Sequence, residues 1–511
     1  MDLPAGRRRA VLACLCATMF MAMLDNVIVN NALPRIGGDL HAGVSSLQWV
    51  VEGYSLVYAA LLLTGGSLGD RFGRTRTYLA GLALFTAGSA AAGLAGGIGE
   101  LVAARGLQGV GAALLTPGSL AILRHVFTDE RERARAIGTW SSVSALGLAA
   151  GPVIGGPIVQ HVGWAGVFWV NVPIGLLALP FAARALPRIP GRERRLDLPG
   201  QLLSALGTGG LVYALVEGPA RGWTDTRVLA GAVLAVLGLA AFALVELRTA
   251  EPMLDLRLVR DPVLGGACLS GFMVSFGVFG AAFFLPLLMQ GVMGWSPSAA
   301  GIAGLPNTVM IVLAAPVASA VTTRFGPRAA IVTGLALTAT ALGGLSLYDG
   351  HAHYPAYLWV LLVLGLGMGL TFTPVSIAVL RRVEPQQAGM ASATINTLRE
   401  LGGVVGVAAL GAVLSSRMTT VLTGGLDRLG GTPRQAAEIS RAFTGGAGAA
   451  LPGPVRAAAT GAFVDGLHLA LRCGSAALAV AAVLVAVLLR PAPAAPAGAP
   501  ADPRRAPAAT R

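Results

Sequence analysis

The 511-residue sequence contains no lysine: all 37 of its basic residues are arginine. The phosphate-binding loop of ATPases and Schiff-base catalysis both require lysine, so the chain can use neither chemistry. Charged residues of both signs make up only 12% of the chain, against about 25% in soluble domains, whereas 55% of its residues are hydrophobic. This composition indicates a membrane protein.

Cysteine and histidine are also scarce, with four and six residues. All four cysteines fall within apolar segments and have no metal-ligand spacing, so we expect small buried side chains. No histidine is expected near the middle of a helix, which leaves carboxylates as the groups that could carry protons. The sequence therefore predicts neither a metal site nor a cofactor.

Long apolar runs, by contrast, occur throughout the chain. A membrane-spanning helix needs about 20 apolar residues, and we identify fourteen such segments. They lie at about 10–32, 47–68, 77–98, 100–123, 134–158, 163–183, 198–216, 228–247, 264–289, 298–321, 328–347, 355–379, 390–415 and 465–489. The first lacks a small-residue cleavage site, so we expect it to be retained. Because helices satisfy their backbone groups internally in lipid, we predict an all-α integral membrane protein.

The formal net charge of +13 is distributed unevenly between the predicted loops. If the N-terminus is cytoplasmic, 26 of the 37 arginines lie in cytoplasmic segments, 8 lie outside and 3 lie within helices. This bias follows the positive-inside rule, and an even number of helices places both termini in the cytoplasm. We therefore attribute the charge to topology in a bacterial cytoplasmic membrane, not to nucleic-acid binding.

Two turns of similar sequence divide the chain, because Arg71-Phe72-Gly73 follows the second segment and Arg324-Phe325-Gly326 follows the tenth. Parallel repeats are an established plan among transporters. We predict an N-terminal six-helix half (1–185), a cytoplasmic linker with a two-helix insertion (186–262), a C-terminal six-helix half (263–490) and a disordered cytoplasmic tail (491–511). A Gly- and Ala-rich stretch at about 416–463 is expected to form an extracytoplasmic loop with no regular fold.

Small residues recur at every fourth position of the fifth segment, so Gly147, Gly151 and Gly155 share one helix face. Such a face lets two membrane helices approach closely. Pro152 removes a backbone donor and bends the helix, and Gly156 follows. By spacing alone, tight packing is a commoner explanation of this pattern than conformational gating.

Ionisable residues inside the predicted helices are candidates for function, because charge is costly in a bilayer. Removal of Asp25 from water favours its neutral form and would let a proton bind and leave; the alternative is a hydrated residue at the end of the helix. Glu52 is a second proton site, a contact for a cationic substrate, or a solvated residue. Because adjacent residues of a helix point apart, we do not expect Arg399 and Glu400 to pair. Asp465 is expected to cap the last helix.

Together these motifs resemble the major facilitator superfamily, specifically its fourteen-helix drug:proton antiporters of the EmrB/QacA type, over about residues 10–490. The matching motifs are Leu24-Asp25 through Pro34, Trp49 with Tyr54, the turn from Gly66 to Arg76, Leu101–Arg105 with Gln108, Gly109 and Gly111, the Gly147–Gly156 segment, and Trp164 to Gly175. The chain departs from the family at Val27, where threonine is usual, and at Asn26, Asn31 and Glu52. These departures concern the substrate class.

The resemblance implies a fold of two six-helix halves plus two extra helices, and it implies roles for particular residues. It assigns proton coupling to Asp25 and Arg105, and we add Glu52 and Glu400 because they lie inside predicted membrane helices. Gating is assigned to Gly66, Gly69, Asp70, Arg71, Gly73, Arg74, Gly147, Gly151, Pro152, Gly155 and Gly156. Substrate contact is assigned to Asn26, Asn30, Trp49, Tyr54 and Gln108.

The leading hypothesis is proton-driven export of a small lipophilic organic compound by alternating access, performed by a monomer. The alternative is proton-coupled export or uptake of a specific metabolite or natural product. A channel is disfavoured because no repeated filter is visible. An enzyme is disfavoured because the sequence has no metal cluster and no nucleophile–base constellation.

Overall fold

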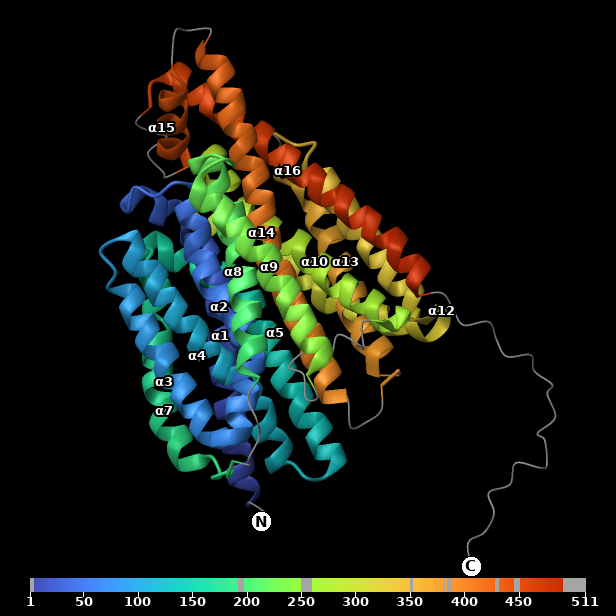
Figure 1. Cartoon of the computed structure of the whole chain (residues 1–511). Helices are drawn as coiled ribbons and strands as arrows, with labels where there is room; N and C mark the ends of the chain where they lie inside the picture. Colours follow the sequence, from blue (N-terminus) through green and yellow to red (C-terminus); the bar gives the residue numbers. More distant parts are fainter. Residues whose placement is uncertain are drawn as a thin grey trace, which may run out of the picture.

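The computed structural model describes residues 4–191, 197–249, 260–349, 353–380, 382–383, 388–427, 432–444 and 451–489. The predicted tail 491–511 and Arg192–Arg195 of the predicted linker lie outside these residues. We call the end of the bundle at which the first helix begins the proximal end, and the end at which that helix finishes the distal end. The N-terminus marks the proximal end at the bottom of Figure 1.

Every regular element in the described ranges is a helix, and Figure 1 shows the helices assembled into one bundle. The first part of the chain forms α1 (Ala5–Asp39), α2 (Val44–Phe72), α3 (Arg74–Gly93), α4 (Ile98–Val126), α5 (Glu130–His161), α6 (Gly166–Trp169) and α7 (Asn171–Ala185). A hairpin of α8 (Leu198–Arg221) and α9 (Thr226–Arg248) follows. The remainder forms α10 (Pro262–Pro286) with a π-helical turn (Leu287–Val292), α11 (Pro297–Ala303), α12 (Leu305–Leu345), α13 (Tyr354–Leu380), α14 (Ala388–Asp427), α15 (Pro433–Thr444) and α16 (Gly453–Leu488).

Each of the fourteen predicted apolar segments coincides with a helix. Eleven helical stretches of the described chain are long and apolar enough to cross a membrane. One of the eleven holds two predicted segments, because α12 breaks at Gly326. The two segments that remain correspond to α3 and α8. The predicted all-α integral membrane class is therefore confirmed.

The two Arg-Phe-Gly turns share one backbone geometry. Gly73 has a φ of 98° and Gly326 a φ of 82°, both in the left-handed region that favours glycine. Each glycine joins two helices with a break of a single residue. The turn after α2 is shorter than expected, because Gly69 still belongs to that helix. Asp70 forms an ion pair with Arg74 at 3.0 Å.

The expectation of an irregular loop at about 416–463 is wrong. Helix α14 continues to Asp427, α15 lies inside the stretch, and α16 already begins at Gly453. The stretch is rich in alanine, the strongest helix former, and this preference outweighs its glycines. Figure 1 shows these helices extending past the rest of the bundle at the distal end.

Three further expectations about residues of α16 are wrong. Asp465 does not cap the helix, because it lies more than three turns inside it, where it pairs with Arg417 at 2.6 Å. His468 also lies within the helix and contacts the carbonyl oxygen of Tyr348 at 3.0 Å. Cys473 is exposed, whereas the other three cysteines are buried as expected.

The glycine face of α5 packs on α1. A Cβ atom added to Gly147 would lie 2.6 Å from the carbonyl oxygen of Phe20, and one added to Gly155 would lie 2.6 Å from Ile28. Gly151 contacts α1 at Val27. These three glycines therefore hold two helices of the same half together, which supports the packing interpretation for them.

Gly156 points elsewhere and contacts the second half of the molecule. A Cβ atom there would lie 2.6 Å from the carbonyl oxygen of Pro297 in α11. Beside it, Gly301 of α11 packs on the carbonyl oxygen of Pro152. Gln290 donates a hydrogen bond to the carbonyl oxygen of Asn31 at 3.1 Å. These contacts close the bundle at its distal end, where α1 finishes and α5 finishes.

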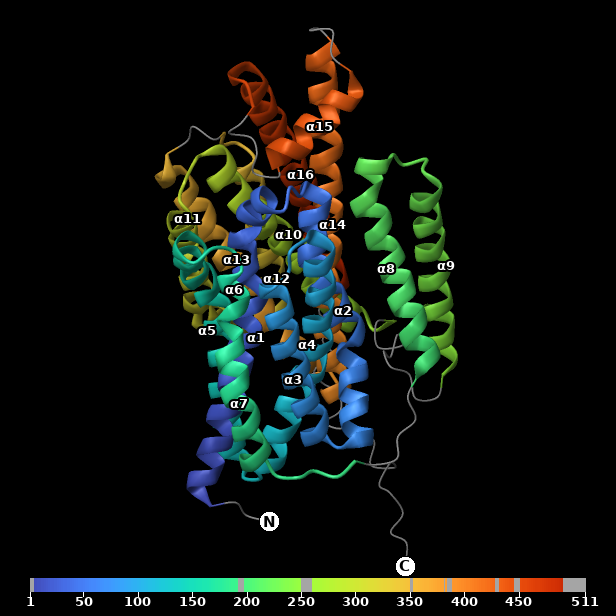
Figure 2. The ribbon, with the colours of Figure 1, turned by 90° about the vertical axis from the view of Figure 1, so that its left-hand side faces the viewer.

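The hairpin of α8 and α9 lies on the flank of the bundle (Figure 2). Helix α8 contacts α2 and α14, which come from different halves of the chain. Val212 and Val216 of α8 form an apolar cluster with Val404 and Ala408 of α14. The hairpin therefore covers the line along which α2 and α14 meet.

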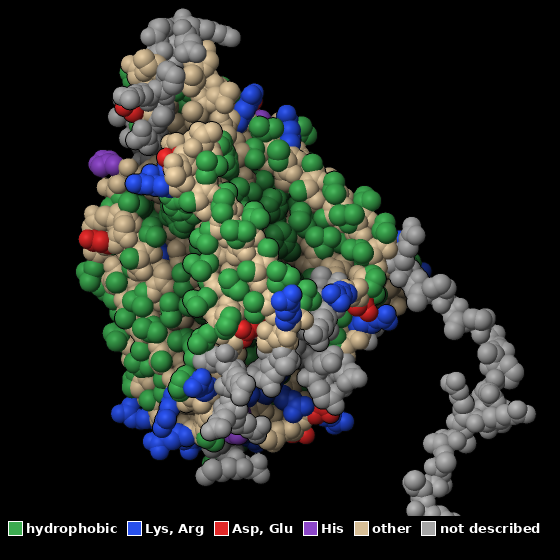
Figure 3. Space-filling model, in the orientation of Figure 1, with side chains coloured by type: hydrophobic (Ala, Val, Ile, Leu, Met, Phe, Trp, Pro, Cys, Tyr) green, Lys and Arg blue, Asp and Glu red, His purple; other side chains and the backbone are tan. Residues whose placement is uncertain are grey.

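The surface of the bundle carries a broad apolar band. Figure 3 shows hydrophobic side chains along the middle of the molecule and arginines gathered mainly around the proximal end. This distribution agrees with the positive-inside pattern read from the sequence.

Candidate functional site

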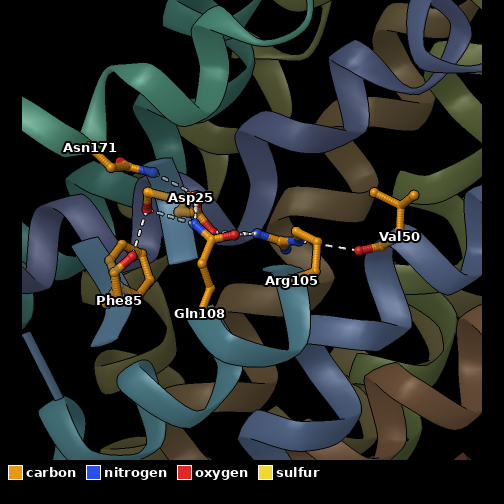
Figure 4. A network of polar contacts seen from close by, with 7 residues as sticks. Asp25, Val50, Phe85, Arg105, Gln108 and Asn171 are labelled. Carbon is orange, nitrogen blue, oxygen red and sulfur yellow. Dashed lines mark hydrogen bonds and ion pairs between the residues drawn. The ribbon is translucent and has the colours of Figure 1, made fainter. Parts of the chain in front are cut away.

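The carboxylate of Asp25 is fully buried among three helices (Figure 4). It accepts hydrogen bonds from Arg105 at 2.5 Å, Gln108 at 2.9 Å and Asn171 at 2.6 Å. These donors come from α4 and from the first residue of α7. Asp25 lies 14 residues before the end of α1, about 20 Å along the axis. The alternative of a hydrated residue at the end of the helix is therefore wrong.

Arg105 links this carboxylate to a further helix. Its Nε donates to the carbonyl oxygen of Val50 at 3.1 Å, and its Nη1 also donates to Gln108 at 2.9 Å. Its guanidinium group lies 4.4 Å from the centre of the Tyr54 ring, a distance typical of a cation–π contact. Arginine suits this position because its planar group can donate in several directions at once.

Glycines allow the surrounding helices to come close enough for these contacts. A Cβ atom on Gly109 would lie 2.7 Å from the carbonyl oxygen of Tyr54, and one on Gly88 would lie 2.8 Å from the nitrogen of Gln108. The backbones of α2 and α3 therefore touch α4 directly. Ser89 extends the network, since it accepts a hydrogen bond from Gln108 at 2.8 Å and donates one to the carbonyl oxygen of Phe85.

The Asp25 network depends on the ion pair between Asp25 and Arg105. A charged Asp25 holds the Arg105 guanidinium group, and a neutral Asp25 would weaken that ion pair and leave a buried cation less compensated. Arg105 also binds α2 through Val50, so such a change would be felt by α1, α2, α4 and α7 together. A change in the charge of this site would therefore alter the packing of four helices.

Glu52 is fully buried, and neither of its carboxylate oxygens has a hydrogen-bond partner among the described residues. A solvated position near the end of α2 is therefore wrong. The same face of α2 carries Gln48, which donates to the carbonyl oxygen of Val407 in α14 at 2.9 Å. An unpartnered buried carboxyl group is costly, and binding of a proton or a cation stays a prediction for Glu52.

Glu400 is largely buried in α14 and pairs with its neighbour Arg399 at 3.3 Å. We did not expect this pair. The two backbone positions do point apart, but both side chains are long enough to bend toward each other. Glu400 also lies within electrostatic reach of Tyr54 and Tyr58 on α2. It does not belong to the Asp25 network.

The residues assigned to substrate contact do not form one group. Gln108 and Tyr54 belong to the environment of Arg105. Trp49 faces α8, where its indole nitrogen donates to Glu217 at 2.9 Å. Asn30 is buried with an unpartnered side-chain oxygen, and Asn26 is half-buried. A role in substrate binding stays a prediction for all of them.

The sequence analysis missed three members of the network: Asn171, Ser89 and the carbonyl group of Val50. Asn171 lies inside the sixth-helix motif but was not given a role. The only available signal was an amide side chain at a point where the helix is interrupted, between α6 and α7.

Within the described ranges no group of three or more metal-ligating side chains occurs. The ionisable groups of the bundle that have a candidate role are those of the Asp25 network, the unpartnered Glu52, and Glu400 with its neighbour Arg399.

Comparisons with known proteins identify the family. The sequence profile of the Major Facilitator Superfamily matches residues 15–407. Multidrug resistance protein Stp of Mycobacterium tuberculosis is 37% identical over 92% of this chain and 91% of its own. The tetracenomycin C resistance and export protein of Streptomyces glaucescens is 37% identical over 94% of this chain and 91% of its own.

The fold comparison agrees. A bacterial homologue of the human lysosomal transporter Spinster superposes with a TM-score of 0.67 at 18% identity, over 95% of this chain and 98% of that structure. The profile and the relatives span the segments that carry Asp25, Arg105 and the two Arg-Phe-Gly turns. The chain belongs to the Major Facilitator Superfamily, and it is a transporter, not an enzyme.

Proposed function

We propose that this protein exports a small lipophilic organic compound in exchange for protons, by alternating access across a bacterial cytoplasmic membrane. The observation that carries the proposal is a fully buried carboxylate, Asp25, held by an arginine that cannot deprotonate. Relatives named for drug resistance and export support the choice of substrate class. Both termini would be cytoplasmic, and the working unit would be a monomer.

The contacts at the distal end fit one state of this cycle. With the N-terminus in the cytoplasm, the distal end faces outward, and the contact of Gly156 with Pro297 closes it. A compound would then enter from the cytoplasm. Opening of the distal end would release it and let an outside proton reach Asp25, whose neutralisation loosens the Arg105 network.

The test of this function is transport into inverted membrane vesicles under an imposed proton gradient, with a panel of dyes and antibiotics. We expect accumulation of at least one compound, accompanied by proton release from the vesicles. Uptake in the opposite sense, with the substrate following the proton, would instead favour the metabolite-import alternative. A response from no compound in a broad panel would contradict drug export.

Glu52→Gln provides a separate prediction. The substitution removes the ability of residue 52 to ionise but leaves a polar group of the same size, so we expect a loss of transport of cationic compounds with the midpoint of thermal unfolding unchanged. If Glu52 binds cations directly, neutral compounds are still exported. If it carries a proton, neutral compounds fail as well.

The matched control for this experiment is Glu100→Gln, which alters an exposed glutamate in the first turn of α4. It should leave transport of both classes of compound unchanged. Unchanged transport in Glu52→Gln would show that this carboxyl group has no part in the cycle.

We propose the same domain division as the sequence predicts, with the α8–α9 insertion moving together with the N-terminal half. The three hydrogen bonds that join α8 to other helices within the described chain all go to α2: from Trp49 to Glu217, from Gln201 to the carbonyl oxygen of Ala60, and between Thr64 and Gln201. The contact of α8 with α14 is apolar. Apolar contacts have no fixed direction, so α14 can slide past α8.

Thiol crosslinking tests this division, in a protein whose natural cysteines are replaced by alanine. Bridging Val216→Cys to Ala408→Cys with a short bifunctional reagent ties α8 to α14 and should stop transport. Bridging Thr64→Cys to Gln201→Cys ties α8 to α2 and should leave transport in place. Equal inhibition by both bridges would contradict the division.

A further inference from the structure

A groove of about 590 Å³ opens on the side of the C-terminal half, between α16 and the part of α12 that follows Gly326. Figure 1 shows the two helices side by side at one edge of the bundle. Small side chains line most of the groove, including Ala336 and Ala479, and valines such as Val483 form its rim. It lies away from the Asp25 network and from the line where α2 meets α14.

The groove exists because the two helices are joined only toward the distal end. Ser475 donates a hydrogen bond to the carbonyl oxygen of Ala339 at 2.8 Å, and Arg472 donates one to the hydroxyl group of Ser346 at 3.4 Å. Toward the proximal end the facing residues are alanines and valines, which are too short to fill the space between the helices. The groove therefore runs along the membrane-spanning part of the bundle toward the proximal end.

Arg328 lies at the proximal end of this groove and belongs to its lining. Its side chain is half-buried, and within the described chain it forms no ion pair and no hydrogen bond. A guanidinium group in this setting is suited to a phosphate, to which it can donate two parallel hydrogen bonds. An apolar groove with one cation at its end matches a molecule that has a long apolar chain and an anionic head.

We propose that this groove binds an anionic phospholipid, with an acyl chain between α12 and α16 and the phosphate group on Arg328. Basic pockets between membrane helices on the cytoplasmic side are suited to such headgroups. A helix of a second copy of this chain, about 10 Å across, would fit the narrow groove less well than an acyl chain. The proposal requires only that the protein spans the membrane, so it is independent of the transported compound.

The experiment measures lipid retention by native mass spectrometry of the purified full-length protein, after exchange into vesicles of phosphatidylglycerol or of phosphatidylcholine. Arg328→Gln should weaken binding of phosphatidylglycerol about five-fold, the change expected for loss of about 1 kcal/mol from one basic residue near the headgroups. Ala479→Phe should fill the groove and abolish retention of both lipids.

The matched control is Arg324→Gln, because Arg324 is an exposed arginine on the other side of the Gly326 break that is not part of the groove. It should leave retention unchanged. Equal losses for the two arginine variants, or retention unaffected by both Arg328→Gln and Ala479→Phe, would overturn the proposal. So would a protein dimer that Ala479→Phe converts to a monomer, because a second copy would then be the occupant. Helical circular dichroism and transport into vesicles show whether each variant is folded.

Discussion

Asp25→Asn is expected to abolish proton-driven accumulation of substrate in inverted vesicles, down to the level of vesicles without the protein. Asparagine keeps the shape of the side chain and can still accept hydrogen bonds from Gln108 and Asn171, but it cannot take up a proton. Exchange of labelled for unlabelled substrate needs no proton and should persist. Substrate-induced proton release should be seen in the wild type only.

Asp39→Asn makes a matched control, because it changes an exposed aspartate at the distal end of the same helix. This variant should transport like the wild type. If Asp25→Asn also behaved like the wild type, the coupled proton would have to be carried by Glu52 or Glu400. Loss of both exchange and gradient-driven transport would indicate a failure of folding or substrate binding, which thermal unfolding distinguishes.

Arg105→Gln is expected to give the largest loss of stability of any single substitution in the network. Removal of one partner of a buried ion pair costs about 3–5 kcal/mol, because the other charge is left without compensation. The measurement is the midpoint of thermal unfolding of the purified protein. Arg105→Lys should be nearly as damaging, since lysine cannot reach Asp25, Gln108 and Val50 while stacking on Tyr54.

The double variant Asp25→Asn/Arg105→Gln separates the ion pair from the rest of the network. Both charges are then absent, so the combined loss of stability should be smaller than the sum of the single losses, with a coupling energy of about 0.5–3 kcal/mol. Transport should remain uncoupled from protons. Strictly additive losses would show that the two side chains contribute independently. Arg472→Gln, which alters another arginine within a helix, should change stability little.

Most of the fold could be predicted from the sequence. The length of each apolar segment and the arginines in the loops between segments are local properties of the chain, and they determine where helices span the membrane. The fourteen apolar runs correspond to helices, and the glycine of each Arg-Phe-Gly turn has the conformation that its residue type favours. The failures lie beyond the distal end, where α14 and α16 extend past the apolar runs. Helix propensity continues there after hydropathy has ended, so the apolar pattern could not mark the true start of α16.

The candidate site was predictable in part. Asp25, Arg105 and Gln108 follow from the cost of burying polar groups in a membrane helix. The contribution of Asn171 could not be predicted, because it depends on an interrupted helix. That interruption brings the Asn171 amide to Asp25, although the two residues are 146 positions apart in the sequence. The burial of Glu52 likewise depends on neighbouring helices. These are tertiary properties, which hydropathy and spacing do not contain.

At the distal end the bundle is closed by glycines that pack directly against peptide carbonyl groups. The tightest contacts, at Gly156 and Gly301, involve no titratable side chain. Attraction between neutral atoms in contact is short-ranged, and a gap of 0.5–1 Å already forfeits about a quarter to a half of it. Most of the contact energy between the two halves is therefore lost over a small displacement, so we expect the distal end to open in a single step without a partly open intermediate. Because neither of these two contacts contains a charged side chain, the ionic strength of the outside medium should have little effect on the rate of closing.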